Sequence, residues 1–452
     1  MLVAAACLSP VRAAWADSIQ GALSKAYMGN PTLRGARAGQ RSTDEQVPQA
    51  LSGWRPTVSL SEQIGPIWTQ TTSTSSFFKQ TTTSRTSTEQ SIGRIVLSQP
   101  VFNGFQTVEG TAEAKAFVKA GQQSLLATEQ QVLFNAAQAY MDVWEYRRFV
   151  ALQQENVKAL QGQLSASNER FKVGEITRTD VAQARASLSQ AKGVLETYRA
   201  TLASQIATYV QIVGTDPGAI NYPSLPRLPA SMEQAFQTAA ELNPTILAQA
   251  YTEDAYHHNI GVKRAPLLPQ ISLNASLQSQ DDLLHAGGQQ QVAQLYGQLS
   301  FSLYDGGLNY SLVRQAKQQA SQQRIKVIEV ARSIRQLVAA SWNQLAAARA
   351  NIGYSNDQVA AAQLALAGVK EEFQAGTRTT LDVLNAQQAV VTAQLTLVVA
   401  QYNQIINGFQ LLDSVGKLTA RDLVLNVPYY DPQENYLNTK GKWIGTGVDT
   451  VE

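Results

Sequence analysis

The sequence predicts an internally duplicated α+β protein, with strands long enough to cross a membrane and long antiparallel helices. Residues 169–183 (ERFKVGEITRTDVAQ) align with residues 371–385 (EEFQAGTRTTLDVLN), so one glycine-centred turn occurs twice. Segments in which polar and apolar residues alternate precede each copy of the turn and indicate strands. Long proline-free stretches with heptad spacing flank each turn and indicate paired helices. Strands followed by helices, repeated once, are typical of an α+β fold.

Composition excludes several classes of partner. The chain has 452 residues, with 36 Lys and Arg against 34 Asp and Glu, and a formal net charge of +2. This balance argues against nucleic acid or another polyanion bound through bulk charge. Charged residues make up only 15% of the chain, well below the roughly 25% of ordinary soluble domains. We expect a surface of neutral polar residues, suited to a water-filled interior.

The N-terminus resembles an export signal. Residues 2–8 (LVAAACL) form a short apolar core, and Ala14-Trp15-Ala16 is an A-x-A site that predicts cleavage before Asp17. A basic leading segment is absent, which suggests that the true start lies upstream. Cys7 is the only cysteine; a lipidation site is the alternative, but the A-x-A site competes with it. The mature chain would then contain no disulfide and no thiolate metal site.

The duplication extends over most of the chain. Pairs such as Asn30 and Asn243 lie 213 positions apart, whereas later pairs such as Gly174 and Gly376 lie 202 apart. The first copy therefore holds a net insertion of 11 residues, and residues 69–90, rich in Ser and Thr, are expected to form an exposed loop. We predict a signal peptide at 1–16, repeats at 17–214 and 231–427, a connector at 215–230 and a tail at 428–452.

Alternating segments occur in both copies. Residues 270–278 and 293–303 alternate without a break, and Val58, Leu60 and Ile64 repeat the phase in the first copy. Two interpretations remain open for these segments alone. They form a soluble hairpin that packs its apolar face on helices, or strands that turn their apolar face to lipid, for which nine to eleven tilted residues suffice. No run of eighteen apolar residues occurs, so we expect no transmembrane helix.

Long helices follow each pair of strands. Residues 105–169 and 308–371 contain no proline, and each stretch could extend roughly 100 Å as a helix. Beyond each glycine turn, apolar residues recur at alternating steps of three and four, as from Val181 to Leu202 and from Val383 to Ala400. This spacing predicts antiparallel coiled-coil hairpins with the glycine turns at their tips.

Lipid-facing strands would require several copies of this chain. Four strands are too few to close, and an open edge in lipid leaves backbone groups unsatisfied at several kcal/mol each. Closed barrels in membranes begin at about eight strands, and three copies would supply about twelve. A trimer would also carry its helical hairpins around the same axis and extend the tube beyond the membrane.

The order of elements resembles the TolC family of bacterial outer-membrane efflux channels over residues 17–427. The resemblance rests on NPTL at 30–33, APLLPQISL at 265–273, LYDGG at 303–307 and GTRTTLDVL at 376–384. It implies an α+β membrane channel: a homotrimer whose four strands per protomer form a 12-stranded β-barrel in the outer membrane, continued through the periplasm by an α-helical barrel. The connector and the tail would build an equatorial belt.

The resemblance also implies a function and partners. The chain would be a passive exit duct of a tripartite efflux pump or a type I secretion system. It would dock onto a periplasmic adaptor (membrane fusion) protein and an inner-membrane ABC or RND transporter, and pass drugs or secreted proteins outward. A soluble periplasmic coiled-coil adaptor or scaffold is the alternative from another class.

Site residues follow from the resemblance by position. Arg378 and Asp180 would form a latch between neighbouring hairpins, and three Asp382 carboxylates would converge on a narrow aperture, with raised pKa values. Two departures from the family weaken this match: Phe373 stands where a Tyr is frequent, and Asn385 replaces a second aperture Asp. The alternative is that Asp180 and Asp382 only cap their helices.

Docking of the adaptor is expected at the hairpin tips, 172–177 and 375–379. The residues concerned are Val173, Gly174, Glu175, Gly376 and Thr377. The two glycines allow a positive φ and would leave a groove between the helices. Turn geometry alone is the competing explanation for them.

Nothing in the sequence predicts an enzyme. The three histidines are His257, His258 and His285, and the first two do not share a helix face. No HExxH motif and no glycine-rich phosphate loop occurs. We therefore expect no catalytic residue, no metal site and no cofactor, and we expect His257 and His258 to be ordinary surface or pore-side polar residues.

Overall fold

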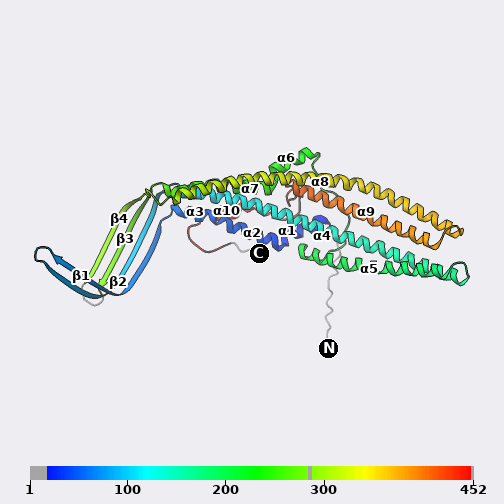
Figure 1. The fold of residues 1–452 in the computed structure, drawn as a ribbon, viewed down its shortest axis with the longest axis horizontal. Helices are drawn as coiled ribbons and strands as arrows, with labels where there is room; N and C mark the ends of the chain where they lie inside the picture. The colour runs from blue at the N-terminus through cyan, green and yellow to red at the C-terminus, as the bar shows by residue number, and fades with distance from the viewer. Residues whose placement is uncertain (1–17, 283–287, 449–452) are drawn as a thin grey trace, which may run out of the picture.

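The protein is elongated, with a β-sheet at one end and two helical hairpins at the other (Figure 1). The computed structural model describes residues 18–282 and 288–448. The predicted signal peptide with Cys7 and the cleavage site at Ala14–Ala16, as well as His285, lie outside the described residues. Four helices longer than thirty residues run along the long axis and determine its length.

Each half of the chain contributes short helices, two strands and one long helical hairpin. The first half comprises α1 (Ile19–Gly29), α2 (Pro31–Asp44), α3 (Gln46–Leu51), β1 (Thr57–Ser75), β2 (Gln80–Asn103), α4 (Gln106–Lys172) and α5 (Arg178–Val213). The second comprises α6 (Met232–Leu242), α7 (Pro244–Arg264), β3 (Gln270–Asp282), β4 (Gln289–Ser300), α8 (Leu308–Gln374) and α9 (Thr380–Ser414), and α10 (Pro432–Thr439) follows. Short 3₁₀ turns at 52–54 and 265–267 lead into β1 and β3.

The predicted duplication is confirmed by contacts that occur twice. Asn30 caps α2 by accepting the amide of Thr32, and its Nδ2 donates to the carbonyl of Ile212 at 3.0 Å. Asn243 caps α7 in the same way, and its Nδ2 donates to the carbonyl of Ser414 at 2.9 Å. Both caps precede a proline at the first helical turn, a position that needs no backbone N–H. The two halves therefore reproduce one tertiary contact, and positions in one half identify counterparts in the other.

The strands form one antiparallel sheet with the order β1-β2-β3-β4. The two halves meet at the β2–β3 pair, which runs from Gln90↔Asp282 to Asn103↔Gln270 with a bulge at Pro100/Phe102. β4 begins at Gln289 and ends at Ser300, so the predicted strand at 293–303 is shifted by a few residues. Val101 is the residue left out of the pairing, and Pro100 stands beside it, at a bulge, where a strand tolerates proline.

Residues 69–90 are not the loop that was expected. β1 and β2 continue as a two-stranded hairpin beyond the four-stranded sheet, over the ten pairs from Pro66↔Glu89 to Ser75↔Gln80. At about 3.3 Å per residue this extension is roughly 30 Å long. The hydroxyls of Thr72 and Thr83 pair across its strands at 3.3 Å. Threonine is a good strand residue, so a Ser/Thr-rich composition was compatible with either structure.

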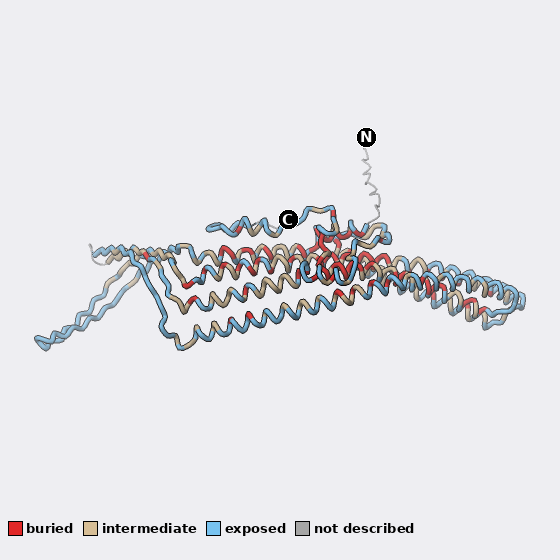
Figure 2. The backbone as a smooth tube through the Cα atoms, turned by 90° about the horizontal axis from the view of Figure 1, so that it is seen from above, coloured by how far each residue is buried: buried red, intermediate tan, exposed pale blue. Residues whose placement is uncertain are grey.

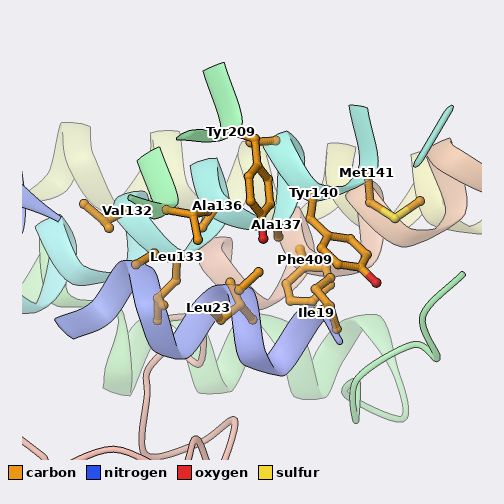
Figure 3. Packing of buried hydrophobic residues seen from close by; sticks show 14 of the residues in the cluster. Ile19, Leu23, Val132, Leu133, Ala136, Ala137, Tyr140, Met141, Tyr209 and Phe409 are labelled. Carbon is orange, nitrogen blue, oxygen red and sulfur yellow. The ribbon is translucent and has the colours of Figure 1, made fainter. Parts of the chain in front are cut away.

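Helices α4 and α5 form one hairpin and α8 and α9 the other (Figure 1). α4 and α8 have 67 residues each, about 100 Å of helix. Buried residues concentrate in the middle of the molecule, where α1 and α9 pack against α4 (Figure 2). Leu23, Leu133, Tyr140, Tyr209 and Phe409 meet in this core (Figure 3).

One described helix, α9, is long and apolar enough to cross a membrane by length and composition. Its most apolar window has a mean hydropathy of 1.3, and 39% of that window is buried in the protomer. Polar residues are interspersed among its apolar ones, so it contains no uninterrupted run of eighteen apolar residues. α9 packs along α8 and against α4, so at least part of its apolar surface joins helices.

The C-terminal residues dock on the first half. α10 packs on α2, where Asn435 Nδ2 donates to Asp44 Oδ2 at 2.7 Å. Arg55 Nη1 donates to the carbonyl of Lys442 at 2.8 Å, and its guanidinium lies 4.7 Å from the centroid of the Trp443 ring. The tail is therefore docked on the first half through α10 and the residues that follow it.

Candidate functional site at the sheet and the hairpin tips

The sheet exposes its apolar face. Val58, Leu60 and Leu295 lie on one face by register and are 68%, 76% and 73% exposed. Asn274 lies on the other face and is 8% exposed, with its Nδ2 donating to Ser272 Oγ at 3.0 Å. A sheet in water buries its apolar face. This sheet does the reverse, which is the arrangement of a strand between lipid and a wet lumen.

The sheet has two edges. β1 and β4 are the outermost strands of the described sheet, and each pairs on one side only. A row of free backbone groups beside an apolar face would be costly in lipid. The sheet therefore needs further strands, and it can obtain them from other copies of the chain.

The helical tips are built on two glycines. Gly174 and Gly376 have φ values of +81° and +78°, a region that is costly for residues with a Cβ. A Cβ at either glycine would meet no heavy atom within 4 Å. Glycine is thus required by the backbone conformation and not by crowding, and both tips present an open surface.

Both aspartates of the tips are helix caps. Thr177 and Asp180 form a capping box at the start of α5, in which Asp180 Oδ2 accepts the Thr177 amide at 2.9 Å. Thr379 and Asp382 form the same box at the start of α9, also with 2.9 Å. Both residues therefore cap their helices, and each box satisfies two backbone donors.

These capping bonds affect titration. Hydrogen bonds from Thr177 lower the pKa of Asp180, and those from Thr379 lower the pKa of Asp382. A carboxylate that accepts several hydrogen bonds resists protonation. In the protomer this opposes the rise in pKa that was expected from three converging Asp382 carboxylates.

Each tip also holds an ion pair, and the two pairs have opposite polarity. In the first hairpin Arg170 on α4 faces Glu175 in the turn, with 3.8 Å between Nε and Oε2. In the second hairpin Glu372 on α8 faces Arg378 in the turn, with 2.7 Å between Oε2 and Nε. Arg170 and Glu372 are counterparts, 202 positions apart. The helix member of the pair is thus reversed in charge between the repeats, whereas the turn members Glu175 and Arg378 do not occupy equivalent positions.

The two hairpins of the protomer touch near their tips. The guanidinium of Arg170 lies over the ring of Phe373, 4.6 Å from its centroid. Leu384 of α9 packs with Leu160, Leu188 and Ala191 of the first hairpin. Asp180 lies close to Thr380, whose hydroxyl also contributes to lowering the pKa of that carboxyl. No hydrogen bond of standard geometry satisfies this buried hydroxyl within the described residues, so the contact is loose.

Arg378 and Asp180 are not in contact within the protomer. Arg378 pairs with Glu372, whereas Asp180 is engaged by Thr177. A latch between them would have to form with a neighbouring protomer or by exchange of partners. Asn385 is exposed on α9, one turn beyond Asp382.

The residues expected to dock an adaptor lie on the outermost surface. Val173 is 72% exposed, and Glu175 and Thr377 are exposed as well. Thr377 Oγ1 donates to the carbonyl of Glu372 at 2.9 Å and closes the second turn. Sequence reasoning missed Arg170, Glu372 and Thr380, although aligning the two copies shows the reversed charge directly.

No metal site is formed in residues 18–282 and 288–448, where no group of three or more His, Cys, Asp or Glu side chains could hold an ion. His258 is more than a surface residue: its Nδ1 lies 2.8 Å from Glu109 Oε2 and joins α7 to α4. This contact links the two halves of the chain. The sequence interpretation placed His258 on the surface because its partner is 149 positions away.

A family model described as outer membrane efflux protein matches residues 22–215 and 235–417. The chain is 40% identical to the outer membrane efflux protein BepC of Brucella suis over 96% of this chain and 93% of that protein. It is 27% identical to the outer membrane protein TolC of Escherichia coli, over 90% of this chain and 84% of that one.

Solved structures show the same fold. The CmeC outer membrane channel of Campylobacter jejuni superposes with a TM-score of 0.79 at 16% identity, over 94% of this chain and 89% of that one. CusC superposes with a TM-score of 0.77 at 16% identity, over 89% and 92% of the two chains.

Proposed function

The chain belongs to the outer membrane efflux protein family, and we propose that the tips of its helical hairpins form both the gate and the adaptor-docking end of the duct. As a member of this family the protein is an outer-membrane channel and not an enzyme. It works as a homotrimer with a periplasmic adaptor and an inner-membrane transporter. The adaptor or scaffold alternative is not favoured.

The exposed apolar face of an open four-stranded sheet carries the functional conclusion. Three copies provide twelve strands, so every edge strand gains a partner and the apolar faces of all three sheets turn outward to lipid. The polar face, with Asn274 and its hydrogen-bonded neighbours, then lines the lumen. The helical hairpins extend away from the sheet (Figure 1) and continue the tube.

The gate is proposed at the far end of this tube, where Asp180, Arg378 and Asp382 lie. Three Asp382 side chains around a threefold axis would concentrate negative charge in a narrow aperture and favour cations. Arg378 can exchange Glu372 for Asp180 of an adjacent hairpin, because its ion pair with Glu372 is exposed and hence weak. Phe373 takes part through its ring and not through a hydroxyl.

Docking is proposed on the same surface. The tips end in exposed residues, Val173 in the first turn and Thr377 in the second, around glycines with open space above them. An adaptor that presents a helical hairpin of its own would find six such tips on a trimer. Docking would then be coupled to the gate, because both use the same two turns.

Both small molecules and secreted protein remain candidate cargo for this duct. One relative is named an alkaline protease secretion protein, and another a toluene efflux pump outer membrane protein. A passive duct fits either, because the transporter selects the substrate. We propose that the same lumen can pass small molecules or unfolded protein.

A single experiment tests the duct. Purified protein is incorporated into planar lipid bilayers, and single-channel conductance is recorded together with the mass of the detergent-solubilised particle by light scattering. We expect a trimer that conducts and prefers cations. A monomer recovered in the detergent-free soluble fraction, or a trimer without conductance, would contradict the proposal.

A further inference from the structure

The two hairpins of one protomer meet along a defined set of contacts, which we call the inner seam. It consists of Arg170 over Phe373, Leu384 packed on the first hairpin, and Asp180 beside Thr380. All three contacts run from one repeat to the other, so the seam joins duplicated units. A seam of this kind can be repeated around a ring.

In a trimer, six hairpins alternate around the axis, and the second hairpin of each protomer faces the first hairpin of a neighbour. We call this second contact the outer seam. If the outer seam is built like the inner one, each contact has a counterpart 202 positions away. The counterparts of Phe373, Thr380 and Leu384 are Phe171, Arg178 and Ala182.

Burial within one protomer supports this correspondence. Thr380 and Leu384 are 2% and 6% exposed, because the first hairpin covers them. Their counterparts Arg178 and Ala182 are exposed, and Phe171 is 44% exposed. Equivalent positions of the two repeats are thus covered in one seam and bare in the other. A second copy of this chain has the surface that covers them.

The outer seam differs in chemistry from the inner one. Thr380 becomes Arg178, Leu384 becomes Ala182, and Arg170 becomes Glu372. Asp382, the counterpart of Asp180, then faces a guanidinium where Asp180 faces a hydroxyl. We propose that in the closed gate Asp382 forms an ion pair with Arg178 of the partner subunit, and that the seam containing this pair is the one that parts when the gate opens, which frees the three Asp382 carboxylates to attract cations.

The rest of the outer seam gives little cohesion. Glu372 over the ring of Phe171 of the partner subunit offers no cation–π attraction, because the ring face is itself negative. Ala182 of the partner subunit presents a much smaller apolar surface than Leu384. An exposed ion pair is weak and screened by salt. The two hairpins of a protomer therefore move together, and neighbouring protomers separate.

The inference rests on the proposed gate, and its test is a pair of matched cross-links. Cysteines replace Arg178 and Asp382 in one variant, and Asp180 and Thr380 in the other, both in a Cys7→Ser background. The trimers are treated in detergent with a short bifunctional thiol reagent. The two cysteine pairs occupy equivalent positions of the two repeats. They therefore test different seams at the same expected spacing. We expect covalent dimers and trimers on denaturing gels for Arg178→Cys/Asp382→Cys, and monomers of altered mobility for Asp180→Cys/Thr380→Cys.

A charge exchange tests the ion pair itself. Asp382→Arg should raise single-channel conductance, Arg178→Asp added to it should return conductance toward wild type, and Arg378→Asp added to it should not. Absence of multimer bands in an intact trimer, or rescue by Arg378→Asp, would overturn the inference and leave the duct unaffected. Loss of the trimer in the wild-type protein would instead remove the duct and this inference with it.

Discussion

Arg170 and Phe373 join the two hairpins of one protomer, with the guanidinium carbon 4.6 Å from the centroid of the ring. These residues are 203 positions apart by number and belong to different repeats. The same guanidinium also faces Glu175 across its own turn. One side chain thus ties a turn to its own helix and to the neighbouring hairpin.

The first prediction concerns this contact. Arg170→Met keeps the length of the side chain but removes the charge, so the cation–π contact and the pairing with Glu175 are both lost. We expect faster amide hydrogen exchange in 170–180 and 373–382, since such contacts contribute about 0.5–1 kcal/mol at exposed sites. Lys172→Met is the control, because Lys172 pairs with Glu169 of its own helix. Equal exchange in both variants would show that Arg170 does not join the hairpins.

The second prediction concerns the lipid face of the sheet. Leu295→Arg places a charge on the exposed apolar face, which costs about 2–4 kcal/mol near the middle of the bilayer. Three copies multiply this cost, so we expect little trimer in the outer-membrane fraction. Gln294→Arg points to the polar face and should assemble normally. If both variants assemble equally well, the apolar face does not meet lipid.

Much of this fold could be predicted because its signals are local or repeated. Alternation over 270–278 gave a strand, heptads gave the hairpins, and the two glycine turns marked the tips. The extended hairpin of β1 and β2 could not be distinguished from a loop, because serine and threonine suit both. The contact between His258 and Glu109 joins helices from different halves, and no local pattern encodes such a pair.

The sequence predicted where the residues of the candidate site lie better than it predicted which residues they contact. Asp180 and Asp382 lie at the tips as expected, but their capping boxes use residues three positions away. Arg378 forms an ion pair with Glu372 and not with Asp180. A sequence shows which charges are present at a tip; the choice among several nearby partners depends on distances of a few ångströms.

The third prediction separates docking from turn geometry at Gly376. Asparagine tolerates a positive φ better than other residues with a Cβ, whereas valine does not. We expect Gly376→Asn to form normal trimers but to impair transport in cells, because its side chain stands on the docking surface. Gly376→Val should lower both trimer yield and transport. Gly193→Ala, in the interior of α5 with open space around it, should be neutral or slightly stabilising. Normal transport by Gly376→Asn would show that the glycine serves only the turn.

The fourth prediction concerns pH. Burial, and then the nearby Asp142, raise the pKa of Glu145 from 4.5 to about 7. The folded state therefore binds a proton more tightly than the unfolded state, and this contribution is complete below pH 4.5. It is lost as pH rises toward 7. Burial also raises the pKa of Asp413 to about 6, which acts in the same direction.

We therefore expect the Tm of the detergent-solubilised trimer to fall between pH 5 and pH 8, and Glu145→Gln to reduce that fall. Circular dichroism measures both. At pH 8 the variant should be the more stable protein, because it avoids a buried charge. Glu155→Gln, on an exposed turn of the same helix, is the control. A Tm that rises with pH in the wild type would contradict the assignment.

The last prediction concerns the seam between protomers. Leu384 fills the inner seam, and its counterpart Ala182 leaves the outer seam with little apolar contact. Ala182→Leu should supply the missing contact and hold neighbouring protomers together. Burial of one leucine side chain contributes about 1.5–3 kcal/mol, and three seams act at once. We expect lower single-channel conductance, fewer opening events and a higher Tm. Ala186→Leu, one helical turn further on the exposed surface of α5, adds the same side chain away from the seam and should change none of these. Leu384→Ala removes the inner contact, so it should loosen the two hairpins of a protomer and lower the Tm. If Ala182→Leu leaves conductance and Tm at wild-type values, the outer seam is not built like the inner one, and gating must depend on another contact.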